Sequence, residues 1–256
     1  MKLNKLIAIA TISLLSGGIS MAQKALNLED IVAGNIIQTK GIGSMTWLKD
    51  GERYSRLENN KQTGGTDIVA YRAKDNSREV IIPSSLLTDK STGRPIPVRS
   101  VSWSADNEKV LIYNNTRRVW RYDTRGDYWV LNLKDGALRQ LGKGMPESSM
   151  MFAKFSPDGT RVAYVSNNNI YVEDIDSGKI TQLTKDGSDT IVNGTFDWVY
   201  EEEFSCRDGF RWSPDGKHIA YWQSDTKGTG VFDTINNVDS IYAKVIHFPY
   251  PKAGTT

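Results

Sequence analysis

The sequence predicts an all-β fold, a partial β-propeller of four-stranded blades, from two observations. An aromatic residue followed by a short turn occurs four times, at Trp47, Trp103, Phe155 and Trp212, at intervals of about 55 residues, which is the size of a propeller blade. Each copy continues into segments in which apolar and polar residues alternate, as they do in half-buried strands. We therefore expect about four blades and the start of a fifth, interrupted by one short helical insertion.

The third copy shows why each repeat is expected to fold as hairpins. In its Ser-Pro-Asp-Gly block at 156–159, proline fixes φ at the second turn position, aspartate suits the third and glycine the fourth. Strands are then predicted at Arg161–Val165, Ile170–Ile175 and Ile180–Leu183. The alternative is a two-sheet β-sandwich, which spaces its strands similarly but gives no reason to repeat the aromatic-turn block.

The end of the sequence is expected to begin a further strand at Ile241–Phe248. Propeller blades bury their faces against neighbouring blades, so four blades alone would leave both terminal faces uncovered. We therefore interpret residues 23–256 as an incomplete set of blades that belongs to a larger propeller.

Residues 1–22 have the composition of a secretory signal peptide. Lys2 and Lys5 precede the apolar run Leu6–Leu15, which is too short to span a bilayer, and small residues allow cleavage after Ala22. The alternative, an uncleaved anchor helix, is disfavoured by the two glycines that follow the run. We expect a bacterial protein that is exported to the periplasm or secreted.

Composition excludes several functional classes. The chain is 39% hydrophobic and 24% charged with a formal net charge of +2, and its basic residues are scattered, so no nucleic-acid partner is expected. The lone Cys206 cannot form an internal disulfide. Cys206 is also not expected to be a catalytic thiol, because neither of the two histidines has a recognisable triad setting in which it could activate the thiol. No Cys/His cluster or His-Glu-x-x-His pattern indicates a metal site, and no cofactor is expected.

The acidic segment Thr195–Phe204 departs from the repeat and is the main functional candidate. Asp197 is expected to cap a short helix by accepting a hydrogen bond from a backbone N–H one or two residues on. Three glutamates, Glu201, Glu202 and Glu203, follow. The alternative interpretation is a solvated acidic face. A second departure is the basic run Arg117–Arg121, for which the alternative is a solvated strand edge.

These departures carry a family resemblance. Asp197–Glu203 resembles the double-glutamate motif of dipeptidyl peptidase IV, a family of exported serine exopeptidases of the prolyl oligopeptidase clan. Trp120-Arg121, followed by Tyr128, resembles the family's substrate-contacting arginine segment, and Phe248–Gly254 resembles a stretch further along its propeller. The resemblance covers essentially all of the chain after the signal peptide. It implies an eight-bladed propeller joined to a C-terminal α/β-hydrolase domain, of which this chain matches about the first half of the propeller.

The resemblance also implies a substrate and a mode of recognition. The family removes dipeptides from peptides with a free N-terminus and Pro or Ala in second position. Carried over by position, Glu202 and Glu203 bind the substrate's α-ammonium, whose three donors suit two carboxylates. Arg121 donates to substrate carbonyl oxygens, with Arg117, Arg118 and Arg125 as nearby competitors. Glu201 is expected to be structural or solvated, because adjacent helical positions point about 100° apart and the three glutamates cannot all converge on one cation.

The chain lacks the residues for the hydrolytic step. No Gly-x-Ser-x-Gly motif, which a hydrolase-type nucleophile needs, occurs in it. The catalytic residues are therefore expected in the C-terminal domain, and the 256 residues alone are expected to be inactive.

The alternative function is a non-enzymatic periplasmic propeller that serves as a binding scaffold. Phe204–Asp208, directly after the glutamates, departs from the family pattern. The resemblance also makes the intact protein a candidate homodimer.

Overall fold

The computed structural model describes residues 27–32, 41 and 43–254. The chain divides into two compact units, Met1–Ile42 and Gly43–Thr256, and the described part of the first contains the short helix α2 (Leu28–Val32). The predicted signal peptide, residues 1–22, lies outside the described residues. Within the described part of the chain, no helix combines the length and apolar character needed to cross a bilayer.

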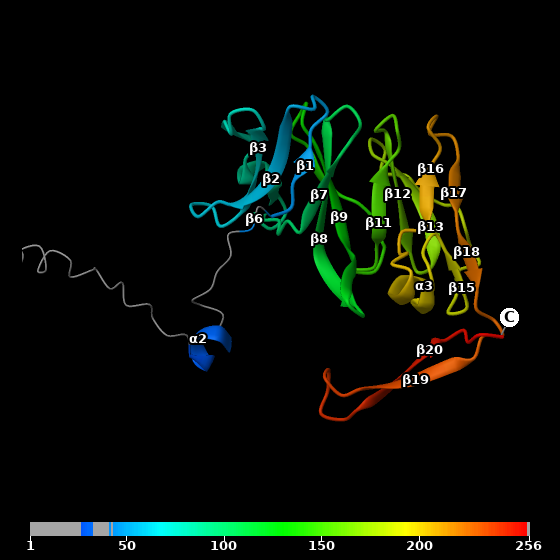
Figure 1. Ribbon diagram of the computed structural model, residues 1–256. Coiled ribbons are helices and arrows are strands. Elements are labelled where there is room, and N and C mark those ends of the chain that lie inside the picture. Colours follow the sequence, from blue (N-terminus) through cyan, green and yellow to red (C-terminus); the bar gives the residue numbers. More distant parts are fainter. Residues whose placement is uncertain (1–26, 33–40, 42, 255–256) are drawn as a thin grey trace, which may run out of the picture. The chain divides into compact units, whose positions relative to one another are not determined.

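Three consecutive four-stranded antiparallel sheets form most of the second unit (Figure 1). The first comprises β1 (Thr46–Trp47), β2 (Arg53–Asn59), β3 (Thr66–Arg72) and β4 (Arg78–Ile82). The second comprises β7 (Ser100–Trp103), β8 (Lys109–Val119), β9 (Tyr122–Asn132) and β10 (Leu138–Gln140). The third comprises β11 (Met151–Phe155), β12 (Arg161–Ser166), β13 (Asn169–Asp174) and β14 (Ile180–Gln182). Strands neighbouring in sequence also neighbour in the sheet, which confirms the predicted all-β architecture of propeller blades.

The connection between the first two sheets contains η1 (Ser84–Leu87), β5 (Thr88–Asp89) and β6 (Arg94–Pro95). The fourth copy of the repeat is divided into shorter pairs. β16 (Phe210–Trp212) pairs with β17 (Ile219–Tyr221), and β15 (Ile191–Asn193) pairs with β18 (Gln223–Asp225). The helix α3 (Trp198–Glu203) lies between β15 and β16 in the sequence. The strand predicted near the C-terminal end is β20 (Lys244–Pro249), and it pairs antiparallel with β19 (Val231–Asn236) as a hairpin.

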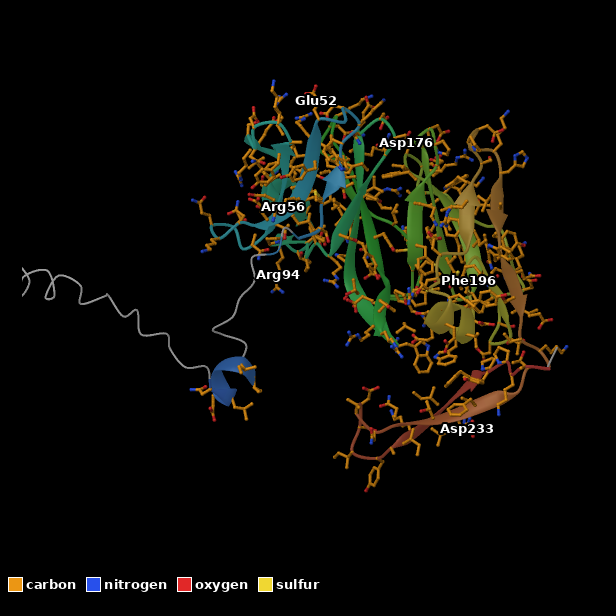
Figure 2. All side chains as sticks on the ribbon, viewed as in Figure 1. Glu52, Arg56, Arg94, Asp176, Phe196 and Asp233 are labelled. Atoms are coloured by element: carbon orange, nitrogen blue, oxygen red, sulfur yellow. The ribbon has the colours of Figure 1, made fainter. Side chains whose placement is uncertain are left out.

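The hydrophobic core lies between neighbouring sheets, where side chains fill the space (Figure 2). On β8, Val110 and Ile112 pack toward the first sheet, whereas Leu111 packs toward the third. On β12, Val162 contributes to the core with the second sheet and Ala163 to the core with β16. Successive side chains on a strand point to opposite faces, so the alternation read from the sequence becomes sheet-to-sheet packing.

The turn block repeats because one serine joins the turn to the next strand. Ser104, Ser156 and Ser213 each donate a hydrogen bond to the aspartate two residues on, over 2.6, 2.5 and 2.6 Å. Each also accepts one from the backbone N–H five residues on, over 2.9, 3.0 and 2.9 Å. The first copy has Leu48 at this position, and there Asp50 accepts from two backbone N–H groups directly.

Candidate functional site

The insertion that carries α3 is closed at its base by two glycines. The Gly209 N–H donates to the Gly194 carbonyl over 3.0 Å, and a Cβ added at Gly209 would lie 2.9 Å from the Gly194 carbonyl carbon. Thr195 Oγ1 donates to the Arg207 carbonyl over 3.1 Å just inside this closure. Because the loop starts and ends at one point, α3 projects from the sheet without interrupting the pairing of the strands around it.

Asp197 caps α3 as predicted, but with a different donor. Its Oδ1 accepts a hydrogen bond from the Tyr200 N–H over 3.1 Å, three residues on rather than one or two. This is the usual reach of an N-cap side chain to the third helical residue. The helix ends after Glu203, where the Phe204 N–H donates to the Tyr200 carbonyl over 3.2 Å. The cap fixes where the helix starts and hence which way its glutamates face.

Arg121 lies in the tight turn between β8 and β9. Val119 and Tyr122 form the last strand pair, which leaves Trp120 and Arg121 as the two turn residues. Trp120 has φ of +54°, in the left-handed region that two-residue hairpins require and that bulky residues seldom adopt. The turn therefore presents an indole and a guanidinium side by side at the end of a long hairpin.

The structure brings Arg121 and Glu202 together. Arg121 Nε lies 2.6 Å from Glu202 Oε2, and the arginine side chain is 77% exposed whereas the glutamate side chain is only 7% exposed. The other carboxylate oxygen, Oε1, is buried and has no hydrogen-bond partner among the described residues. A buried carboxylate oxygen without a donor is costly, so this atom is an acceptor with capacity for a ligand.

The two neighbouring glutamates have different surroundings. Glu201 is half-buried and forms an ion pair with Arg207, whose Nε lies 3.3 Å from Glu201 Oε1. Burial raises the pKa of the Glu201 carboxyl, and the Arg207 charge works against that rise. Arg207 also lies over the ring of Tyr122, 3.6 Å from its centroid. Glu203 is exposed, and within the described part of the chain it has no ion pair.

Five aromatic side chains surround the Arg121–Glu202 pair and form what we call the aromatic pocket. Trp198 packs against Phe248 and Tyr250 at ring-centroid distances of 4.9 and 5.2 Å, and Trp120 packs against Phe248 at 5.1 Å. Phe232 on β19 completes the wall, 5.6 Å from Phe248. The cavity, of about 510 Å³, is lined by these rings together with Arg121, Glu202 and Thr234.

Sequence reasoning identified part of this pocket and missed the rest. Phe248 and Tyr250 belong to the segment that carried the resemblance, but nothing assigned them a position, and Phe232 was not singled out. The sequence does contain a signal for the two C-terminal members of the pocket. The aromatic residues at 248 and 250 occupy alternate positions at the end of a strand, and alternate positions lie on the same face. Arg117, Arg118 and Arg125 do not line the aromatic pocket.

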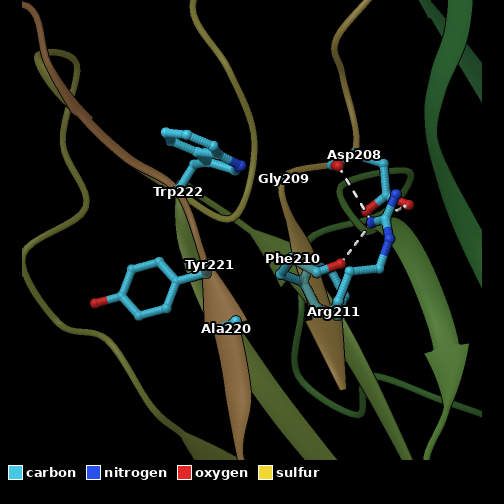
Figure 3. A pocket seen from close by; sticks show the side chains of 7 residues that line it. All are labelled: Asp208, Gly209, Phe210, Arg211, Ala220, Tyr221 and Trp222. Carbon is cyan, nitrogen blue, oxygen red and sulfur yellow. Dashed lines mark hydrogen bonds and ion pairs between the residues drawn. The ribbon is translucent and has the colours of Figure 1, made fainter. Parts of the chain in front are cut away.

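A second hollow, of about 480 Å³, lies along β16 and β17 and contains none of the predicted site residues (Figure 3). Arg211 Nη1 lies 2.9 Å from Asp208 Oδ2, and Lys154 Nζ lies 2.5 Å from Asp208 Oδ1. Burial lowers the pKa of Lys154 to about 8, although its ion pair with Asp208 opposes the change. In the described residues, no group of three or more His, Cys, Asp or Glu is arranged to hold a metal.

Comparison with known proteins assigns this chain to a family. Residues 104–256 match the family model of the dipeptidyl peptidase IV (DPP IV) N-terminal region. Dipeptidyl aminopeptidase B of Saccharomyces cerevisiae is 30% identical over 240 residues, which cover 88% of this chain and 27% of that protein. A probable dipeptidyl-aminopeptidase B of Podospora anserina is 34% identical over 163 residues, covering 59% of this chain and 18% of that protein.

A solved structure supports the same assignment. The crystal structure of Porphyromonas gingivalis dipeptidyl peptidase 4 matches with a TM-score of 0.75 at 26% identity, covering 91% of this chain and 32% of that chain. The chain thus spans less than a third of the length of each of these proteins. More than half of its residues match the family model, and the chain therefore belongs to the dipeptidyl peptidase IV N-terminal region family.

Proposed function

We propose that this chain is the N-terminal propeller segment of an exported serine dipeptidyl peptidase that releases Xaa-Pro and Xaa-Ala dipeptides. Its role is to bind the N-terminal ammonium of the peptide substrate. The observation that carries the proposal is the state of Glu202, which is nearly buried and paired through one oxygen with Arg121, while its other oxygen has no hydrogen-bond partner among the residues that the structure describes.

The chemistry of an α-ammonium fits this arrangement. An ammonium has three N–H donors, and Glu202 Oε1 supplies a buried acceptor for one of them. Glu203, adjacent and exposed, supplies a second carboxylate that can turn toward the same cation. An α-amine has an ordinary pKa of about 7.7–8.0, so it is mostly charged at neutral pH, and nearby carboxylates favour the charged form further.

Arg121 has two roles in this proposal. In the empty site its ion pair balances the buried charge of Glu202. Its side chain is largely exposed, so little packing holds it there, and it can donate to a substrate carbonyl oxygen when the ammonium replaces it. An internal peptide segment brings no cation, so this site selects chain ends and sets the cut two residues in.

The hydrolytic step belongs to a C-terminal α/β-hydrolase domain of the same protein, which would supply the nucleophilic serine with its histidine and aspartate. The present chain contributes recognition only. We expect the purified 256-residue chain to release no dipeptide from a Gly-Pro or Ala-Pro chromogenic substrate, and the intact protein to release it.

The decisive variant in the intact protein is Glu202→Gln, which keeps the shape of the side chain and removes its charge. Loss of a charge-assisted hydrogen bond of about 2–3 kcal/mol lowers kcat/KM for Gly-Pro release roughly 30- to 150-fold. Glu52→Gln is the matched control. Glu52 is exposed and forms an ion pair with Arg72 of the first sheet, and it is far from Glu202 in the sequence. An unchanged kcat/KM in Glu202→Gln would contradict the proposal.

A further inference from the structure

A third hollow, of about 600 Å³, lies along the second sheet and shares no lining residue with the aromatic pocket. Asn114 on β8 and Asp127 on β9 line this hollow, lie opposite each other in the strand pair, and are only 7% and 8% exposed. Polar side chains buried to this extent are normally hydrogen-bonded. Asn114 Oδ1, however, is buried and has no hydrogen-bond partner among the described residues. The hollow therefore contains an acceptor with capacity for a donor.

The repeated scaffold explains the buried aspartate but not the asparagine opposite it. Asp127 accepts hydrogen bonds from the Ser148 N–H over 2.8 Å and from Asn115 Nδ2 over 2.7 Å. Asp67 of the first sheet is also 8% exposed and accepts from one backbone N–H and one asparagine amide in the same way. Opposite Asp67 lies Glu58, whose carboxylate forms an ion pair with an arginine. Of these two sheets, only the second places an unpartnered oxygen opposite its buried aspartate.

The hollow also has an excess of negative charge. Glu147 lines it, and Asn115 Nδ2 donates to both carboxylates, over 2.8 Å to Glu147 and 2.7 Å to Asp127. Within the described part of the chain, neither carboxylate forms an ion pair. Arg99 is the one cation among the described residues that line the hollow, and its Nη2 lies 3.2 Å from Asp123 Oδ2. The two carboxylates can thus share one nitrogen donor, and each has lone pairs for a further one.

These groups suit an organic ammonium better than a metal ion. A calcium ion takes about six to eight oxygen ligands, whereas no group of three or more His, Cys, Asp or Glu in the described residues is arranged to hold a metal. A primary ammonium has three N–H donors, one each for the oxygen of Asn114 and for the two carboxylates. Trp129 and Val98 in the same wall offer apolar surface to an alkyl chain, as the stem of a lysine side chain requires.

We propose that this hollow, which we call the polar hollow, binds a primary alkylammonium, whether the side chain of a lysine or a free diamine. The ammonium donates to Asn114 Oδ1 and to the carboxylates of Asp127 and Glu147, and its alkyl chain lies against Trp129. The proposal is independent of the site at Glu202, because Glu202 does not line the polar hollow.

Calorimetric titration of the intact protein with cadaverine and with Nα-acetyl-lysine amide tests the proposal. Both probes carry a primary ammonium on an alkyl chain, and 1,5-pentanediol is the uncharged control. We expect at least one of the two amines to bind, in the unmodified protein and in Glu202→Gln alike, and pentanediol not to bind. Binding of the lysine derivative would identify a lysine side chain as a ligand, and binding of cadaverine alone would identify a free diamine.

Three variants and a matched control locate the binding. Asn114→Leu, Glu147→Gln and Asp127→Asn each remove one acceptor and should raise the Kd roughly tenfold or more. Asn114→Leu should not lower Tm, because it removes a buried oxygen that has no hydrogen bond to lose. Asp67→Asn removes the same charge from the equivalent scaffold position and should leave the Kd unchanged. If Asp127→Asn fails to fold, the exposed Glu147 and the Asn114 variant decide.

Four results would overturn the proposal. The first is no binding of either amine at millimolar concentration, and the second is a Kd that none of the three variants changes. The third is binding that disappears in Glu202→Gln, which would place the amine at the proposed peptide site instead. The fourth is Ca²⁺ binding more tightly than either amine and depending on the same residues, which would make the polar hollow a site for an inorganic cation.

Discussion

At the scale of single residues, three consecutive glutamates have three different surroundings. Glu201 forms an ion pair with Arg207, and Glu203 is exposed. Glu202 is nearly buried, and one of its carboxylate oxygens has no hydrogen-bond partner within the described part of the chain. The rotation of about 100° per helical residue separates them, so the sequence run does not act as one acidic patch. These surroundings support the proposal that Glu202 binds the ligand, whereas Glu201 is held in its ion pair with Arg207.

Lys154 gives a pH-dependent prediction at this scale. Burial lowers its pKa from 10.5 to about 8 in the folded chain, so between these values the unfolded state binds more protons and rising pH stabilises the fold. The contribution is present above pH 10.5 and is lost as the pH falls through 8. We expect Lys154→Met to lose about 2 kcal/mol more stability, relative to the parent, at pH 10 than at pH 7.

Urea unfolding at the two pH values checks this expectation. Lys134→Met is the matched control, since Lys134 is 68% exposed and its ion pair with Glu108 raises the pKa of its ammonium. A pH-independent difference between Lys154→Met and its parent would show that Lys154 is charged in the fold throughout the range.

At the scale of elements, local side-chain-to-backbone hydrogen bonds determine the geometry of both the β-sheets and the site. The serine of the turn block joins a turn to its strand, and the aspartate cap sets the start of α3. Each of these hydrogen bonds joins residues no more than five positions apart. For this reason, its effect can be tested by removing one side chain.

For the turn block, Ser156→Ala is expected to cost about 1–3 kcal/mol of unfolding free energy. The side chain is buried, and its loss removes the acceptor that the Ser156 hydroxyl offers to the Arg161 N–H and one of the donors to the Asp158 carboxylate, which keeps its hydrogen bonds from Thr160. The Ser156 hydroxyl, with the Thr160 N–H, holds the pKa of Asp158 at about 2, so that pKa should rise in the variant. Ser213→Ala, at a less buried copy of the same turn, should cost less, and equal costs would argue against burial as the cause.

For α3, Asp197→Ala removes the cap and is expected to destabilise the helix by about 1 kcal/mol. In the intact protein, amide hydrogens of residues 198–203 should exchange faster, and KM for Gly-Pro release should rise because Glu202 is held less firmly. Asp197→Ser retains a capping oxygen and should restore both quantities. Failure of the serine variant to do so would mean that the aspartate charge, and not the cap, is responsible.

At the scale of the whole chain, Phe248 joins three segments that are far apart in the sequence. It contacts Trp120 in the β8–β9 turn, Trp198 on α3 and Phe232 on β19, and it is 9% exposed. These contacts hold the turn with Arg121 against the helix with Glu202. The hairpin of β19 and β20 thus contributes to the site although it carries neither charged residue.

We therefore expect Phe248→Ala to raise KM of the intact protein roughly tenfold with a much smaller change in kcat, because misplacement of the binding groups weakens binding before it affects the hydrolytic step. Phe248→Leu, which keeps most of the buried volume, should recover part of the loss. Val245→Ala, on the opposite face of β20 and 56% exposed, is the control. A fall in the apparent kcat of both Phe248 variants with KM unchanged would instead indicate general unfolding, which removes active enzyme without altering the site of the remainder.

The sequence by itself determined the blades, the turns, the capped helix and the family to which the chain belongs. Those features depend on the alternation of apolar and polar residues within a strand and on hydrogen bonds across a few residues. Both are determined by residues that are close together in the sequence. Only the tertiary structure decided that Arg121 pairs with Glu202, that Glu203 stands apart, and that Phe232 and Phe248 enclose the pair. The Arg121–Glu202 pair joins residues that lie 81 positions apart (202 − 121). All of these contacts depend on how the sheets and the last hairpin pack, which no local sequence pattern records.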